Sequence, residues 1–193
     1  MKVSEYVIKI QKRLEKNFPF PGWGKVSSAD MTKFDESVYL PTDSYSSKRE
    51  FEVEGFNATL YSQLVSMDPN LPYDRWVCHV FFFRNRYLGE EDVVWTYQKA
   101  LRIWGRKQVK GMEDHSIIGV LLSEDGFSER VIDIIERAYY VEEVGEGIMG
   151  QYLVGIDLSK ELVYVPLSER IKKLGKHAEV GLKRFFDIFS SNQ

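Results

Sequence analysis

Residues 81–105 read FFFRNRYLGEEDVVWTYQKALRIWG, and this stretch decides the fold. The three phenylalanines end an apolar run over residues 75–83, and such a near-continuous run is typical of a strand buried on both faces. Three acidic residues follow at 90–92, where the dipole of a starting helix favours negative charge. An apolar stripe at helical spacing comes next, at Val94, Tyr97, Leu101 and Trp104. The stretch therefore predicts a buried strand, a short loop and a helix with Gly105 as its left-handed cap.

The residues before this unit predict a helix, a polar loop and a strand with acidic side chains. Apolar residues at helical spacing predict a helix from about residue 2 to 17. Residues 25–48 are rich in Ser, Thr and Asp and predict a loop, with a short strand at 37–40. The segment REFEVEGF, residues 49–56, alternates apolar and acidic side chains as a strand does. Residues 66–74 are turn-rich and predict a second loop.

The residues after this unit continue the alternation of strands and helices. They predict, in order, a buried strand at 116–122, a helix at 129–138 capped by Ser128, a strand at 139–144, a hairpin at 151–166 with its turn at 157–160, and a last helix that begins after Ser168. Strands and helices that alternate at short spacing indicate a partly parallel sheet covered by helices. We expect an α/β domain over residues 1–166, followed by an amphipathic helix over 167–193.

The composition excludes several classes of protein. The 193 residues are 44% hydrophobic, which is ample for a core, and the net charge of −3 is not that of a generally basic nucleic-acid binder. Cys78 is the only cysteine, so neither an internal disulfide nor a Cys-rich zinc site can form. No apolar run approaches the ~20 residues of a membrane-spanning helix. We expect a cytoplasmic protein that does not enter a membrane.

Taken together, the order of these elements resembles the PD-(D/E)XK nuclease superfamily, which includes restriction enzymes and archaeal Holliday-junction resolvases. The resemblance covers about Val3 to Val144. Residues 49–56 resemble the second core strand of the family, residues 79–101 its third strand and following helix, and residues 117–138 a later strand and helix. The resemblance implies a restriction-endonuclease-like fold: a mixed sheet in three layers with helices on both sides, here followed by the hairpin and the last helix.

The resemblance also implies where a catalytic centre would lie. The family places an acid in its second strand, where this chain has Glu52, and ends its third strand with an acid, an apolar residue and a lysine. The matching residues here are Phe82, Phe83 and Arg84. Because two carboxylates must hold the divalent cation that activates water, a phenylalanine at this position removes a ligand. We therefore interpret Glu52, Phe82 and Arg84 as a vestigial centre that has no catalytic residues and needs no cofactor.

Two other interpretations of the same residues stay open. A working Mg²⁺- or Mn²⁺-dependent endonuclease would need a displaced acid, so that Glu54, Asp74 or Glu90 completes a site with Glu52. A purely regulatory protein-interaction module would need no such site. The alternating acids at 50, 52 and 54 also fit an ordinary solvated strand face.

The basic residues suggest a partner. Arg84 and Arg86 follow the buried strand, at the edge where such sheets bind ligands, and either capture phosphate or simply end the strand in solvent. A second group lies on and after the helix, at Lys99, Arg102, Arg106 and Lys107. Both groups are candidate contacts to DNA backbone. The resemblance to dimeric resolvases further implies a homodimer through the C-terminal helix, while His79, Trp95 and Trp104 are expected in the core.

Overall fold

The computed structural model describes residues 1–17, 42–68, 71–84, 91–111, 113–166 and 188–189. Its helices are α1 (Val3–Asn17), α2 (Glu91–Arg106) and α3 (Glu129–Arg137). Its strands are β1 (Thr42–Val53), β2 (Phe56–Asp68), β3 (Leu71–Arg84), β4 (Asp114–Ser123), β5 (Tyr139–Val144), β6 (Gly147–Asp157) and β7 (Leu162–Tyr164).

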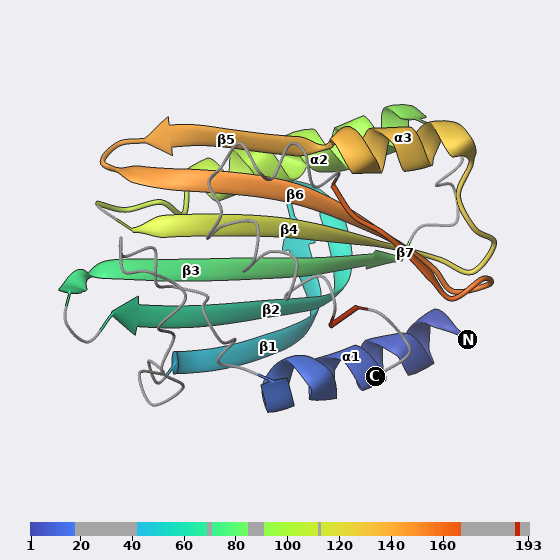
Figure 1. The fold of residues 1–193 in the computed structure, drawn as a ribbon, viewed down its shortest axis with the longest axis horizontal. Coiled ribbons are helices and arrows are strands. Elements are labelled where there is room, and N and C mark those ends of the chain that lie inside the picture. Colours follow the sequence, from blue (N-terminus) through green and yellow to red (C-terminus); the bar gives the residue numbers. More distant parts are fainter. Residues whose placement is uncertain (18–41, 69–70, 85–90, 112, 167–187, 190–193) are drawn as a thin grey trace, which may run out of the picture.

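The strands form one mixed sheet of seven strands in the order β1-β2-β3-β4-β6-β5, with β7 paired to β6 (Figure 1). The first three strands are an antiparallel meander. The next pairs, β3 with β4 and β4 with β6, are parallel, while β5 runs antiparallel to β6. The prediction of a partly parallel sheet is therefore confirmed.

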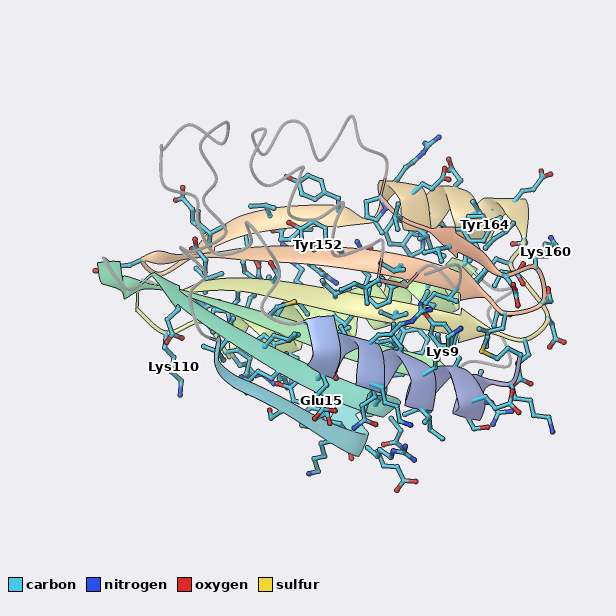
Figure 2. All side chains as sticks on the ribbon, turned by 60° about the horizontal axis from the view of Figure 1, so that its bottom comes forward. Lys9, Glu15, Lys110, Tyr152, Lys160 and Tyr164 are labelled. Atoms are coloured by element: carbon cyan, nitrogen blue, oxygen red, sulfur yellow. The ribbon has the colours of Figure 1, made fainter. Side chains whose placement is uncertain are left out.

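Helices cover both faces of the sheet, which gives three layers. Alternate residues of β3 point to opposite sides: Phe82 joins the core under α1, whereas Phe81 and Phe83 join the core under α2 and α3. Figure 1 shows α1 in front of the sheet and α2 behind it. Figure 2 shows Tyr152 of β6 on the same face as α1. Burial of residues 77–83 of β3 explains their near-continuous apolar sequence.

The turn between β1 and β2 is set by Glu54 and Gly55. Both have positive φ, at 47° and 87°, and they connect the paired residues Val53 and Phe56. Positive φ at both central residues defines the tight hairpin turn that matches strand twist, and glycine adopts it without steric cost. This hairpin places β2 between β1 and β3.

Gly105 is not a left-handed cap, contrary to the sequence prediction. It lies inside α2, which continues to Arg106. A Cβ atom at this position would come within 2.7 Å of Met149 Sδ and 2.8 Å of Ile117 Cγ1. Gly105 therefore lets α2 approach β4 and β6 closely, a packing role that helical periodicity does not reveal.

Several predicted boundaries are confirmed and two loops are not. Ser128 caps α3, since its Oγ accepts a hydrogen bond from the Val131 amide at 3.3 Å, and the turn after Asp157 separates β6 from β7 as predicted. The predicted loop at 66–74 is wrong, because β2 extends to Asp68 and β3 begins at Leu71. The predicted loop at 25–48 is wrong from Thr42 onward, where β1 begins. The short strand at 37–40 lies outside the described residues.

The C-terminal helix predicted over 167–193 also lies outside the described residues, except for positions 188 and 189. There Phe189 is fully buried, and its ring lies 6.1 Å from that of Phe82. The Tyr6 hydroxyl donates to the Phe189 carbonyl at 3.1 Å, and Arg13 donates to the Ile188 carbonyl at 3.3 Å. At these two residues the chain folds back onto its own sheet, and a homodimer through this segment stays a prediction. None of the described helices is both long and apolar enough to cross a bilayer.

Candidate functional site

Phe82 is the residue that the resemblance matches to a metal ligand of the nuclease family. It pairs with Leu60 of β2 and Val120 of β4, and its side chain is fully buried against Phe189. A benzyl ring carries no oxygen donor, and divalent cations such as Mg²⁺ require oxygen ligands. Phe82 therefore acts as a core residue at this position.

Arg84 ends β3 on the same face and is exposed. Its Nη2 lies 3.7 Å from Oε1 of Glu124, the residue that follows β4. The same oxygen accepts a hydrogen bond from the Val3 amide, at the start of α1, at 2.8 Å. Arg84 and the first turn of α1 thus share one carboxylate, so this cation is already paired within the chain.

Glu52 does not meet Phe82 or Arg84. It lies on β1, opposite Asn57, and β2 separates its strand from β3. Glu54 lies in the turn that follows, where its Oε1 accepts a bond from Lys107 Nζ at 2.6 Å. The two acids expected to hold a metal are therefore apart from the end of β3.

None of the residues matched to the family's motif at the end of β3, Phe82, Phe83 and Arg84, has an oxygen donor in its side chain. Among the residues whose placement the structure describes, no three Asp, Glu, His or Cys side chains converge as a metal site. The side chain of Asp74 and all of Arg86 and Glu90 lie outside that description, so the displaced-acid alternative is untested at those positions.

Of the four basic residues predicted on and after α2, three are paired with acids: Arg102, Arg106 and Lys107. Arg106 donates through Nε and Nη2 to the two carboxylate oxygens of Glu142 on β5, and the Nε bond measures 2.5 Å. Arg102 lies 3.6 Å from the same carboxylate, and Lys107 is bound to Glu54. The hydrogen bonds from Arg106, and to a smaller extent the bond from Tyr140 and the charges of the two arginines, lower the pKa of Glu142 to about 2. Glu142 is therefore charged at neutral pH and fixes both arginines.

A hollow of about 410 Å³ lies beside this group, between α2, the end of α3 and strands β5 and β6. The side chains that line it include Trp95, Lys99, Arg102, Arg137, Tyr140 and Gln151. Three of these are cationic, and the described lining contains no carboxylate. We call this cavity the α2–β5 hollow.

Arg102 is fixed at one wall of the α2–β5 hollow. Its guanidinium carbon lies 3.7 Å from the centre of the Tyr140 ring, and its Nη2 donates to the Tyr140 hydroxyl. That hydroxyl in turn donates to Glu142 at 2.8 Å. Stacking on an aromatic face and a shared carboxylate hold the arginine in one orientation.

Two buried polar atoms of the hollow have no partner among the described residues: Nε of Arg102 and Oε1 of Gln151. The Gln151 side chain is 1% exposed, and its Nε2 donates to the Gln98 carbonyl of α2 at 2.6 Å. Because a carbonyl can only accept, this bond fixes which end of the Gln151 amide is oxygen. The orphaned Gln151 oxygen is therefore an acceptor, and buried acceptors normally have a donor.

The sequence did not predict this hollow, and the prediction for one of its residues was wrong. Trp95 was expected in the core, but its side chain is 50% exposed. The signal was present: Trp95, Lys99, Arg102 and Arg106 recur at helical spacing and share one face of α2. The contributions of Arg137, Tyr140 and Gln151 come from other elements, and no local pattern identifies them.

A second polar feature crosses the core beneath α2. Tyr61, His79 and His115 come from three neighbouring strands, and Glu113 precedes β4. The Tyr61 hydroxyl lies 2.9 Å from Nδ1 of His79, and Nε2 of His115 lies 3.2 Å from Oε2 of Glu113. The two imidazoles are bonded to each other. His79 is thus a hydrogen-bonded core histidine, as expected.

Comparisons of the chain with protein-family models, with curated proteins and with solved structures found no match. The function is therefore inferred from the residues and geometry of this chain.

Proposed function

We propose that this chain has a restriction-endonuclease-like fold of the PD-(D/E)XK type and binds DNA without cleaving it. The observation that carries the proposal is the position of Phe82. The resemblance matches this residue to a metal ligand, and its side chain is buried between β2, β4 and Phe189. Without that ligand, the metal-activated water of a nuclease has no place to form.

The topology supports the proposed fold class. From β3 onward, the order β3, α2, β4, α3, β5 is the one on which the resemblance is based. Before β3 the structure differs: residues 49–53, matched to the second core strand, belong to β1, and β2 lies between them and β3. The sheet is mixed and has helices on both faces. Topology alone does not carry function, so DNA binding rests on the charges below.

The charge balance around the end of α2 supports an anionic partner. Among the described ion pairs, the three cations Arg102, Arg106 and Lys107 share two carboxylates, Glu142 and Glu54, and Lys99 lies on the same helix. The Lys107 side chain is 60% exposed despite its ion pair. Exposed pairs contribute only about 0–1 kcal/mol, so DNA phosphates can replace the carboxylate at little cost.

The test is a combined cleavage and retention assay. Branched, single-stranded and duplex DNA are incubated with the protein and Mg²⁺ or Mn²⁺, and retention is measured as salt is raised. We expect no cutting, and retention at low salt that falls steeply with added salt. Lys110 is a further exposed cation that follows α2. A Lys107→Ala/Lys110→Ala variant should weaken retention, while Lys9→Ala/Lys12→Ala on α1 should not. Metal-dependent cutting that disappears in Glu52→Ala would refute the proposal.

A protein-interaction role is the second candidate, and the β5 edge favours it. In the described sheet β5 pairs only with β6, and Val141 and Ile148 of this hairpin are exposed. An open strand edge with apolar side chains is a common docking surface for another chain. Absence of DNA retention even at low salt would favour this role over DNA binding.

A further inference from the structure

The α2–β5 hollow combines positive charge with an open face that is not needed for the core. Lys99 and Trp95 are exposed on α2. Arg137 lines the hollow from the end of α3 and is also paired with Asp133 at 2.8 Å. No ion pair or hydrogen bond within the described residues engages the Lys99 ammonium group. Its charge is therefore available to an anion that enters the hollow, and no described carboxylate in the lining would repel that anion.

The hollow also offers an aromatic surface. The Trp95 ring is half exposed and makes no ring contact with another described residue. An indole is usually buried or engaged at an interface, because it has a large apolar face and one donor. Trp95 therefore provides a stacking surface at the opening, of the kind on which heterocyclic bases stack in single-stranded nucleic acids.

A third feature demands a hydrogen-bond donor from outside the described residues. The Gln151 Oε1 atom is a buried acceptor without a partner, and its orientation is fixed by the bond of Nε2 to the Gln98 carbonyl. The exocyclic amino and ring N–H groups of nucleobases are donors of the required kind. A ligand with such a group would satisfy this oxygen, whereas a simple anion would not.

From these three features we propose that the α2–β5 hollow binds a nucleoside phosphate: phosphate on Lys99 and Arg137, base on Trp95, and a base donor on Gln151. The volume of about 410 Å³ lies within the ~300–1,000 Å³ range of small-molecule sites. The proposal does not require the DNA binding proposed above.

A nucleoside phosphate has two sources: a free mononucleotide, or the end of a nucleic-acid strand. Calorimetric titration distinguishes them with adenosine and cytidine monophosphates in one arm and 5′-phosphorylated single-stranded oligonucleotides in the other. Adenosine, ribose 5-phosphate and inorganic phosphate serve as ligands that each lack one recognised part. We expect at least one phosphorylated nucleoside probe to bind about tenfold more tightly than any of these three, because charge-assisted bonds and base stacking each contribute.

Two variants localise the binding. Lys99→Glu and Trp95→Ala change exposed side chains, so the fold should persist, which circular dichroism checks. Each should weaken binding by about tenfold or more. The matched control is Lys9→Glu, an exposed lysine on α1 at the opposite face of the sheet (Figure 2), and it should bind as wild type does.

Each outcome tests the nucleoside-phosphate proposal independently of the DNA-binding proposal. Mononucleotide binding that is lost in both variants supports a free nucleotide as ligand, and oligonucleotide binding alone with the same losses supports a strand end. Lack of binding of either probe at millimolar concentration overturns the proposal, even if blunt duplex DNA is retained. Binding that the two variants leave unchanged, or that inorganic phosphate matches, also overturns it.

Discussion

Nε2 of His79 lies 3.1 Å from Nδ1 of His115, and both imidazoles are buried, at 2% and 4% exposed. An ionised Glu113 can only accept, so His115 must donate to it through Nε2. A neutral His115 then accepts at Nδ1 from His79, which in turn accepts from the Tyr61 hydroxyl. With both histidines neutral, one direction of donation satisfies the whole chain from Tyr61 to Glu113.

This pair predicts a loss of stability in acid. Burial, and secondarily His115, lowers the pKa of His79 from 6.5 to about 3. Between these values the unfolded chain binds a proton that the folded chain does not, so the free energy of unfolding falls as pH falls. We expect a loss of about 2 kcal/mol between pH 7 and pH 5, measured by urea unfolding.

The control is a variant that cannot titrate at this position. His79→Phe removes the imidazole, and its unfolding free energy should change less between pH 7 and pH 5 than that of the wild type. The relevant comparison is the slope with pH, because the substitution also removes the hydrogen bonds of His79 to Tyr61 and to His115 and lowers stability at every pH. Equal slopes would show that His79 is not the group that resists protonation.

Phe82 predicts a large loss of stability with no gain of activity. Phe82→Ala opens a cavity beside Phe189 and should cost about 3–5 kcal/mol in urea unfolding. Phe82→Asp supplies the carboxylate that a nuclease would have, but buries it among Leu60 and Val120 without a partner. We expect this variant to be at least as unstable as Phe82→Ala. A folded Phe82→Asp variant that cleaves DNA with Mg²⁺ would show that the centre is latent rather than absent.

Replacing Gly105 by alanine should destabilise the protein, although the same change inside a helix usually stabilises it. Replacing an interior helical glycine by alanine normally stabilises by about 0.5–1 kcal/mol. Here the new methyl would lie within 2.8 Å of both Met149 and Ile117, so Gly105→Ala should lower the melting temperature. In a Met149→Ala background, Gly105→Ala should lower the melting temperature less than it does in the wild type. A higher melting temperature in the single variant would contradict the close packing of α2 on β4 and β6.

The sequence predicted the elements better than their connections. Periodicity located α1, α2 and α3 within two residues at most ends, because amphipathic helices are strongly patterned. It missed the hairpin at Glu54–Gly55, since Glu-Gly is a weaker turn signal than Asn-Gly. Residues 66–74 were predicted to form a loop because they are polar and include proline. Most of them belong to strands because β2 and β3 pair with each other, and the local sequence does not reveal that pairing.

The candidate site could be predicted only in part. Lys99 and Arg102 were identified from charge on α2, and both line the α2–β5 hollow. Glu142, which fixes Arg102, and Gln151, which lines the hollow from β6, lie about 40–50 residues further along the chain, so only the folded sheet brings them to α2. The ion pair between Arg84 and Glu124 could not be predicted from the sequence either, because it depends on β3 and β4 being parallel neighbours.

The central claim is that this sheet carries no nuclease metal centre, and calorimetric titration with Mn²⁺ tests it most directly. We predict no saturable binding at millimolar Mn²⁺, for the wild type and for Glu52→Ala alike, because Phe82 offers no oxygen and β2 separates Glu52 from the end of β3. Saturable binding of one or two ions that is lost in Glu52→Ala would contradict the claim.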